Sequence, residues 1–232
     1  MMEFLQQLDQ RLLLLINGCH TPFWDSFMWI FSGKLTWVPM YAAILYVLLR
    51  NFKMSVGFYL VVAITLTIVF TDQVCASWIR PWVERMRPSN PDNPVSEFIH
   101  LVNGKRGGRY GFPSCHAANS FGLAFLFLFF RRGPVTVFVL LWAAVNSYSR
   151  VYLGVHYPGD LLAGMVVALA GASLFFFLFR FFLKQPRVAA FLRYSGDIRE
   201  RMEGRKPLEQ KNVILYAGLL TVVCFTVYSL IL

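Results

Sequence analysis

Residues 134–183 read PVTVFVLLWAAVNSYSRVYLGVHYPGDLLAGMVVALAGASLFFFLFRFFL. Two apolar runs, residues 134–148 and 158–183, flank the polar stretch SRVYLGVHYPGD, Ser149 to Asp160. Each run is expected to form a helix across a bilayer, which needs about 20 apolar residues, or somewhat fewer where aromatic residues anchor the ends. Charged groups beside a bilayer are costly and usually have a function. The junction between the two runs is therefore the first place to look for a site.

The composition of the whole chain is that of a membrane protein. Of its 232 residues, 57% are hydrophobic and 15% are charged, and the mean hydropathy is +0.53; a soluble domain averages roughly 25% charged residues. Four further apolar segments can span a membrane, namely 35–50, 54–79, 117–131 and 212–232. The expected fold is all-α, an integral membrane helical bundle with about six transmembrane helices. A single domain over residues 1–232 is expected.

The segments before the first span are expected at the membrane surface. Residues 4–17 have the pattern of an amphipathic helix lying in the interface, and residues 23–32 are aromatic enough for the headgroup level. The apolar run LLLLI, Leu12 to Ile16, is not expected to belong to a cleavable signal. Acidic residues precede it, and no small-residue cleavage site follows.

The basic residues predict an orientation. Three connections between spans are basic, namely residues 50–53, residues 131–134 and the longer segment 184–211. With six spans they fall on one side, which the positive-inside rule assigns to the cytoplasm. The N-terminus and residues 80–116 and 149–157 then face outward, which in a bacterial inner membrane means the periplasm. These connections carry most of the net charge of +10. Nucleic-acid binding is not expected, because no basic module lies outside the bundle.

The cysteines and two of the histidines do not predict a metal site or a disulfide framework. The cysteines are Cys19, Cys75, Cys115 and Cys224. They form no CxxC motif, and no cysteine and histidine have metal-ligand spacing. His20 and His100 are expected to be interfacial histidines, and contact between His100 and a substrate is the alternative.

Three polar clusters are expected on the outward side. They are RPWVERMRPSNP, Arg80 to Pro91; GFPSCH, Gly111 to His116; and the stretch SRVYLGVHYPGD quoted above. Each cluster lies where a loop meets a span. All three can therefore converge at one depth in the membrane.

In the third cluster, Pro158 and Asp160 are expected to lie at the start of the helix over residues 158–183, and this position determines what the neighbouring side chains can do. Pro158 suits the first turn of a helix because its missing N–H would have no partner there, and Asp160 then lies where the helix dipole favours an anion. His156 precedes Asp160 by four residues. The carboxylate can then hold one imidazole nitrogen and leave the other free as a nucleophile. Arg150 ends the preceding span, and its planar guanidinium group suits phosphate.

The other two clusters add hydrogen-bond donors and positive charge. Ser114 supplies a hydroxyl group, and His116 begins a span, where backbone N–H groups form an anion site. Arg80 and Arg87 add two guanidinium groups, with Arg85 between them. Cationic donors, two histidines and one carboxylate together suit a bound phosphoryl group, a nucleophile and a general acid.

These clusters resemble the motifs of the type 2 phosphatidic acid phosphatase (PAP2) superfamily. Arg80, six residues and then Arg87-Pro88 resemble its K-x6-R-P motif, and PSCH resembles its P-S-G-H motif. SRVYLGVHYPGD matches its S-R-x5-H-x3-D motif. The order of the motifs and their positions relative to the spans, over residues 80–160, are also similar. The resemblance implies a PAP2-like core and a bacterial membrane lipid phosphatase.

The resemblance also implies a role for each residue. His156 would attack phosphorus and form a phosphohistidine, Asp160 would orient His156, and His116 would protonate the leaving oxygen and later activate water. The phosphate oxygens would be held by Arg80, Arg87, Ser114, the backbone N–H of Cys115, and Arg150. No metal or other cofactor is expected, because the arginines supply the charge that Mg²⁺ supplies in other phosphoryl transfers.

Two positions depart from the motifs of the family. Arg80 stands where lysine is usual; it keeps the charge, but its bulkier fork changes how phosphate is held. Cys115 stands where glycine is usual. A positive φ at this position would strain Cys115. We expect instead an ordinary backbone, with the N–H still pointing inward and a bulkier rim. Nucleophilic attack by Cys115 is the alternative to attack by His156.

Other charged groups near the clusters have simpler interpretations. Glu84 and Arg85 are expected to form a surface pair. The loop GKRGGRYG, Gly104 to Gly111, carries three basic residues among glycines. It is either a mobile rim for an anionic headgroup or a segment attracted to the membrane surface.

The expected reaction is hydrolysis of a phosphomonoester or diphosphate on an envelope lipid. The lipid tail would enter between spans while the phosphate reaches the arginines. Candidate substrates are undecaprenyl diphosphate, lipid A phosphates, phosphatidylglycerol phosphate and phosphatidic acid, and the motifs do not choose among them. Two alternatives use the same residues, namely phosphoryl transfer to an acceptor other than water, and non-catalytic binding or transport of lipid phosphates. The expected partners are the bilayer and a phosphorylated lipid.

Overall fold

The computed structural model describes residues 2–130, 132–191, 200–201 and 206–231. Over these residues the regular structure is helical, apart from one isolated antiparallel bridge between Met86 and Tyr110. The α-helices are α1 (Met2–Gly18), α2 (Pro22–Phe31), α3 (Val38–Asn51), α4 (Met54–Gln73), α5 (Arg80–Val83), α6 (Cys115–Phe130), α7 (Pro134–Tyr152), α8 (Pro158–Lys184), α9 (Pro186–Phe191) and α11 (Asn212–Ile231). Shorter turns are η1 (Leu35–Trp37), the π-helical η2 (Val74–Ile79), η3 (Pro94–Phe98) and η4 (Val102–Gly104).

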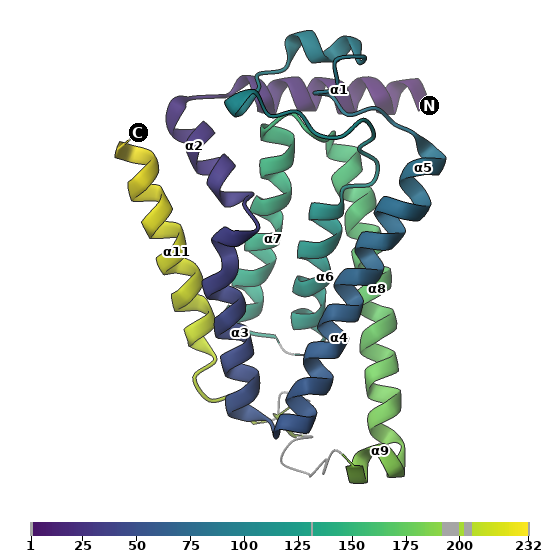
Figure 1. Ribbon diagram of the computed structural model, residues 1–232, viewed down its shortest axis with the longest axis vertical. Helices are drawn as coiled ribbons and strands as arrows, with labels where there is room; N and C mark the ends of the chain where they lie inside the picture. Colours follow the sequence, from purple (N-terminus) through teal and green to yellow (C-terminus); the bar gives the residue numbers. More distant parts are fainter. Residues whose placement is uncertain (1, 131, 192–199, 202–205, 232) are drawn as a thin grey trace.

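The long helices lie side by side as a bundle. Helices α3, α4, α6, α7, α8 and α11 run along the long axis of the molecule (Figure 1). Within the bundle, α6 contacts α4, α7 and α8, whereas α11 packs on α3. This arrangement confirms the predicted all-α membrane bundle.

The predicted spans correspond to helices, and three of these helices are by themselves long and apolar enough to cross a membrane. By length and composition, Met54–Val83, Pro158–Lys184 and Asn212–Ile231 can each cross a membrane. The bent pair Pro22–Phe31 and Leu35–Asn51 supplies a fourth span if the two helices are counted together. The total of six spans therefore stays a prediction, as does the single domain.

The second predicted span extends beyond its predicted end at residue 79. Helix α4 continues through the π-helical turn η2 into α5, so that the apolar helix reaches Val83. Pro81 has no N–H to donate to the preceding turn, and the π-helical turn ends two residues before it, at Ile79. The extension carries Arg80 on a helix instead of a loop.

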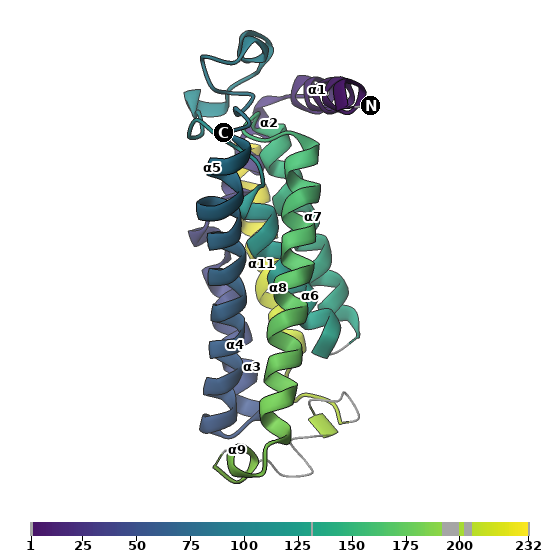
Figure 2. The same cartoon turned by 90° about the vertical axis from the view of Figure 1, so that its right-hand side faces the viewer.

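Helix α1 lies across one end of the bundle, as predicted for residues 4–17. Figures 1 and 2 show it roughly perpendicular to the long helices. Its exposed apolar side chains are Phe4, Leu5, Leu8, Leu12 and Leu15. Leu13 and Asn17 face the protein and are buried. An amphipathic helix in this position suits a membrane surface.

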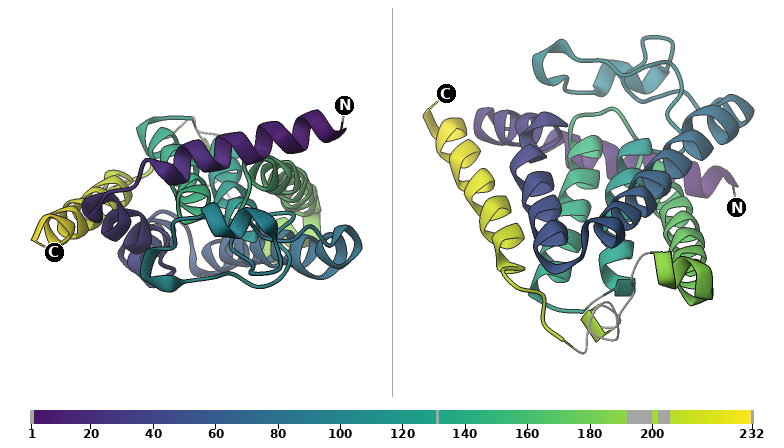
Figure 3. Two further views of the ribbon diagram at one scale, coloured as in Figure 1. Left: turned by 90° about the horizontal axis from the view of Figure 1, so that it is seen from above. Right: turned by 60° about the horizontal axis from the view of Figure 1, so that its bottom comes forward.

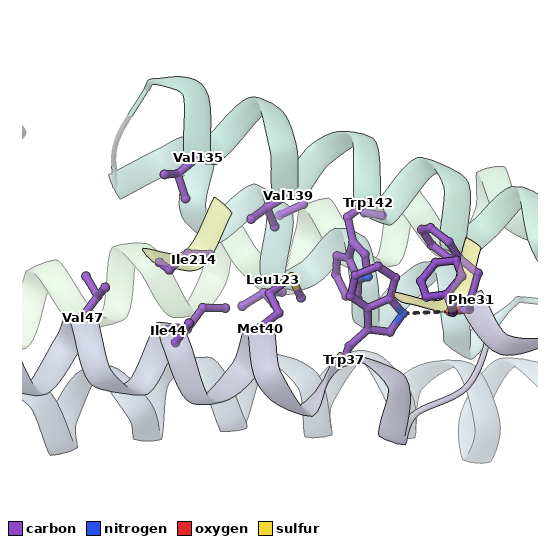
Figure 4. Close-up of a cluster of buried hydrophobic side chains, with 14 residues drawn as sticks. Phe31, Trp37, Met40, Ile44, Val47, Leu123, Val135, Val139, Trp142 and Ile214 are labelled. Carbon is purple, nitrogen blue, oxygen red and sulfur yellow. Dashed lines mark hydrogen bonds between the residues drawn. The ribbon is translucent and has the colours of Figure 1, made fainter. Parts of the chain in front are cut away.

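A buried cluster fixes the bend between α2 and α3. Trp37 is 2% exposed and packs against Trp142 of α7 and Phe225 of α11. Its indole N–H donates to the carbonyl of Phe31 at 2.8 Å (Figure 4). The two helices meet at 71°. Side-chain packing of this kind holds helices together where lipid replaces water.

The three polar clusters lie at the same end of the bundle. The segment between α5 and α6, the turn between α7 and α8, and α1 occupy one end, whereas the α3–α4 connection and α9 lie at the other (Figure 1). Residues far apart in the sequence can therefore form one site.

Candidate active site

His156 and Asp160 form the predicted pair at the start of α8. Each side chain is 1% exposed, and His156 Nδ1 lies 3.1 Å from Asp160 Oδ2. Pro158 is in the first turn of the helix, as predicted. Asp160 also accepts a hydrogen bond from the Tyr157 N–H at 3.0 Å, so that one carboxylate caps the helix and holds the imidazole.

Arg87 and Asp160 together determine which imidazole nitrogen of His156 carries the proton. Its Nη1 lies 2.8 Å from His156 Nε2. A guanidinium group only donates hydrogen bonds, so Nε2 is the acceptor and Nδ1 carries the proton that faces Asp160. Burial and the charge of Arg87 hold the pKa of His156 well below its ordinary value. His156 is therefore neutral, with the lone pair of Nε2 directed at Arg87.

Three arginines place uncompensated positive charge beside this nitrogen. Within the described part of the chain, Arg80, Arg87 and Arg150 form no ion pair with a carboxylate. The Nε atoms of Arg80 and Arg150 are buried without a hydrogen-bond partner. Burial and the charge of Arg80 lower the pKa of Arg87 to about 10. Unpaired buried donors are costly, so the cluster is arranged for an anion.

The start of α6 contributes the second cluster. The Ser114 hydroxyl lies 3.5 Å from the Ala117 N–H, and its own backbone N–H donates to the Asp160 carbonyl at 2.9 Å. This second bond ties the α6 and α8 starts together. Cys115 begins α6 with no positive φ. The expectation that cysteine fits here without backbone strain is confirmed.

The two departures from the family's motifs contact each other. Arg80 Nη2 lies 3.0 Å from Cys115 Sγ and 3.0 Å from the Pro113 carbonyl. The guanidinium group of Arg80 therefore contacts the sulfur atom of Cys115. A glycine at position 115, as is usual in the family, would not provide this contact. Arg80 and Cys115 form one structural unit.

His116 faces the same space as Arg150. Both residues line a cavity of about 320 Å³, together with Lys105. His116 and Cys115 also line a larger cavity of about 580 Å³. Apolar side chains of α3 and α4, including Ile44 and Ile64, contribute to the wall of this cavity. The polar cluster thus opens directly onto an apolar cavity beside the spans.

The prediction of a Glu84–Arg85 surface pair is wrong. Arg85 Nη1 donates to Asp160 Oδ1 at 2.9 Å, and Nη2 lies 2.7 Å from Asp9 Oδ2 on α1. Glu84 is exposed and ends α5 in the left-handed conformation, with φ 49°. The chain reverses at Glu84, which sends the next side chain toward the site.

Asp9 is the other residue of the site that sequence reasoning missed. It lies on the face of α1 that carries the buried Leu13 and Asn17, at spacings of four residues. This periodicity is a signal that could have placed Asp9 against the protein.

His100 lies outside the arginine cluster. Its Nε2 is 2.8 Å from Asp25 Oδ2, and its ring stacks on that of His20 with centroids 3.7 Å apart. His20, Asp25 and His100 each place one atom that could bind a metal ion within 4.8 Å of the others, and they are the one such group among the described residues. The two rings are nearly parallel, so they would have to turn before both could point at one ion.

Glycines let the loop 104–111 approach the site. A Cβ at Gly107 would lie 2.6 Å from Arg87, and one at Gly111 would lie 3.2 Å from Asp160 Oδ2. Arg106 donates to the Ser89 carbonyl at 2.6 Å. The loop thus covers Arg87, and its role as a headgroup rim or a membrane contact stays open.

Comparison with known proteins agrees with this geometry. A lipid A 4'-phosphatase of Bacteroides thetaiotaomicron is 50% identical over 100% of this chain and 99% of its own. A lipid A 4'-phosphatase of Porphyromonas gingivalis is 34% identical over 72% of this chain and 71% of its own. The crystal structure of Aquifex aeolicus LpxE shares the fold, with a TM-score of 0.54 and 23% identity over 72% of this chain and 93% of that chain. The PAP2 superfamily model matches residues 52–186, which include all three motifs, and the chain therefore belongs to the PAP2 superfamily.

Proposed function

We propose that this membrane lipid phosphatase removes the 4'-phosphate of lipid A. The observation that carries the proposal is the neutral, buried His156, whose Nε2 contacts Arg87 and which also feels the charges of Arg80 and Arg150, and none of these three arginines has a carboxylate partner among the described residues. Such an arrangement suits attack on a bound phosphate. The choice of lipid A rests on the similarity to the two lipid A 4'-phosphatases.

Phosphate binding prepares the nucleophile. The phosphate oxygens draw the Arg87 guanidinium group away from His156 Nε2, because an anion is a stronger acceptor than an imidazole. Arg80 and Arg150 donate to the same anion through groups that lack partners without it. Nε2 is then free to face phosphorus. Ser114 and the Cys115 N–H at the helix start complete the cradle.

The reaction then proceeds in two steps. His156 Nε2 forms a bond to phosphorus as the bond from phosphorus to the lipid oxygen breaks, and His116 gives its proton to that oxygen. The ring keeps its Nδ1 proton on Asp160, which stabilises the positive charge. Water next attacks the phosphohistidine while His116 takes its proton, and inorganic phosphate leaves. The arginines stabilise the charge on the transferring group in both steps.

The larger cavity supports an acylated substrate. Its volume is about 580 Å³, and its apolar wall extends from His116 along α3 and α4. An acyl chain in this cavity would bring the phosphate of a membrane lipid to the arginines. A water-soluble phosphoester would leave the apolar wall unfilled.

The proposed location is the inner membrane, with the active site on the periplasmic side. The basic connections 50–53 and 184–211 support this orientation, because positive residues favour the cytoplasmic side. The catalytic end lies opposite the α3–α4 connection (Figure 1).

A substrate panel tests the proposal. Purified protein in detergent is incubated with lipid A phosphorylated on both sugars, undecaprenyl diphosphate, phosphatidylglycerol phosphate and phosphatidic acid. Free phosphate is measured, and mass spectrometry locates the phosphate that remains on lipid A. We expect loss of the 4'-phosphate, at a rate that EDTA does not change. Preference for another lipid, loss of the other phosphate, or phosphorylation of an acceptor without free phosphate would contradict the proposal.

A further inference from the structure

The carboxylate of Asp160 is held on both oxygens. Oδ2 accepts hydrogen bonds from His156 Nδ1 and the Tyr157 N–H, at 3.1 and 3.0 Å. Oδ1 accepts one from Arg85 Nη1 at 2.9 Å. Arg85 therefore fixes the oxygen that the imidazole does not use, and with it the plane of the carboxylate.

Arg85 is in turn held by Asp9. The two side chains are 24% and 14% exposed, and Arg85 Nη2 lies 2.7 Å from Asp9 Oδ2. The guanidinium group also lies 4.0 Å from the centre of the Tyr157 ring. A guanidinium group held by two carboxylates and an aromatic face has little freedom to turn.

Asp9 also binds the start of α8 directly. Its Oδ1 accepts a hydrogen bond from the Gly159 N–H at 2.7 Å, next to Asp160 in the sequence. A Cβ at Gly159 would lie 2.6 Å from Asp9 Oδ2, so the close approach depends on glycine. One carboxylate on α1 thus holds both Arg85 and the helix turn that carries Asp160.

We propose that Arg85 and Asp9 are positioning residues, which hold Asp160 so that it keeps His156 in its reactive tautomer and orientation. The proposal rests on the proposed function, because it concerns the same pair of residues. Helix α1 crosses the end of the bundle (Figure 3), and its Asp9 contacts Arg85 and the start of α8. The α1 helix thereby becomes part of the support of the active site, in addition to lying at the membrane surface.

Substitutions at Arg85 and Asp9 test the proposal in the full-length protein. Arg85 acts on His156 only through Asp160, and loss of a group that supports another functional residue in this way, as measured at metal sites, lowers activity by about 10- to 100-fold. We therefore expect Arg85→Gln to lower kcat by that factor with little change in KM. Arg85→Lys should recover only part of the loss, because one ammonium group cannot bridge two carboxylates. Asp9→Asn should have a smaller effect, because its amide oxygen still accepts from the Gly159 N–H.

Two measurements separate positioning from other roles. If Arg85 acts through Asp160, Arg85→Gln adds no further loss to Asp160→Asn in the double variant. If Arg85 instead binds phosphate, Arg85→Gln weakens inhibition by vanadate, which we expect to be unchanged. Arg11→Gln is the matched control, because Arg11 is exposed on the same α1 helix. Thermal unfolding of each variant shows whether it is folded.

A third measurement does not depend on lipid hydrolysis. The ¹⁵N shifts of the imidazole report the tautomer of His156, which should lose its uniform Nδ1–H form in Arg85→Gln and keep it in Arg11→Gln. An inactive wild type would refute the proposed function and leave this readout intact. An unchanged tautomer, a kcat within twofold of wild type, an additive double variant or weaker vanadate inhibition would each overturn the positioning role.

Discussion

Substitution of Gly164 by alanine is expected to disturb the active site from within the bundle. Gly164 lies on α8, one turn beyond Asp160, where α8 contacts the start of α6. A Cβ at this position would lie 2.5 Å from the Ser114 carbonyl oxygen and 3.2 Å from both the Ala117 Cβ and the Ala118 nitrogen. Two of these three neighbours are backbone atoms, which cannot rotate away.

The size of the effect follows from this contact. Real Cβ contacts essentially never fall below 3.0 Å, so the two helices must separate by about 0.5 Å or more. Overpacking of this kind typically costs about 1–3 kcal/mol of stability. The backbone N–H of Ser114 donates a hydrogen bond to the Asp160 carbonyl at 2.9 Å, and Ser114 directly precedes Cys115, whose N–H belongs to the proposed phosphate site. The separation therefore shifts the phosphate cradle relative to His156, and displacements up to 1 Å lower rates by about 10- to 100-fold.

The assay compares Gly164→Ala with a matched control. Gly57→Ala places a Cβ on α4, where the nearest atoms are 3.8 and 3.9 Å away, in ordinary contact. Phosphate release from the preferred lipid gives kcat and KM, and thermal unfolding in detergent gives stability. Gly57→Ala should match wild type in both. Wild-type activity in Gly164→Ala, or an equal loss in Gly57→Ala, would refute the idea that close packing of α8 on the start of α6 at Gly164 positions the phosphate-binding groups relative to His156.

Three further predictions concern the site itself. His156→Ala should reduce phosphate release to background and Asp160→Asn by about 10⁴-fold, the loss expected when a carboxylate no longer fixes an imidazole tautomer; release by His156→Ala at the wild-type rate would exclude His156 as nucleophile. Because burial and Arg87 hold the pKa of His156 well below the ordinary histidine value of about 6.5, protonation of His156 should lower kcat/KM only at a pH well below 6.5. If kcat/KM began to fall above pH 6.5 as the pH was lowered, and this fall depended on His156, the pKa of His156 would not be lowered as stated. Arg80→Lys and Cys115→Gly should each impair the enzyme and partly compensate in the double variant, by about 0.5–3 kcal/mol of coupling; additive losses in kcat/KM would show that their contact has no role.

Several features of the site follow from local sequence. Pro158 and Asp160 start a helix whatever packs against it, and their spacing from His156 already places imidazole beside carboxylate. The observed distance of 3.1 Å agrees with this local geometry. The positions of the long apolar helices follow equally from composition, because lipid requires each span to satisfy its own backbone hydrogen bonds.

Other contacts join segments that the sequence keeps far apart. Arg85 was expected to pair with its neighbour Glu84, yet it bonds to Asp9 and Asp160, 76 and 75 residues away. Charge patterns along a chain show only near neighbours, and a reversal such as that at Glu84 changes which side of the chain faces the site. The contact between Arg80 and Cys115 likewise depends on how α5 and α6 pack.

The sequence by itself determined the membrane-helical class, the three motifs that resemble those of the PAP2 superfamily and the His156–Asp160 pair. Each of these depends on hydropathy or on short spacings along the chain, which are local properties. Only the tertiary structure decided that α1 reaches the active site through Asp9, that His100 stays with Asp25, and that an apolar cavity opens beside His116. These features depend on side chains from several helices meeting in three dimensions, and the energy of such packing is not encoded in any one segment.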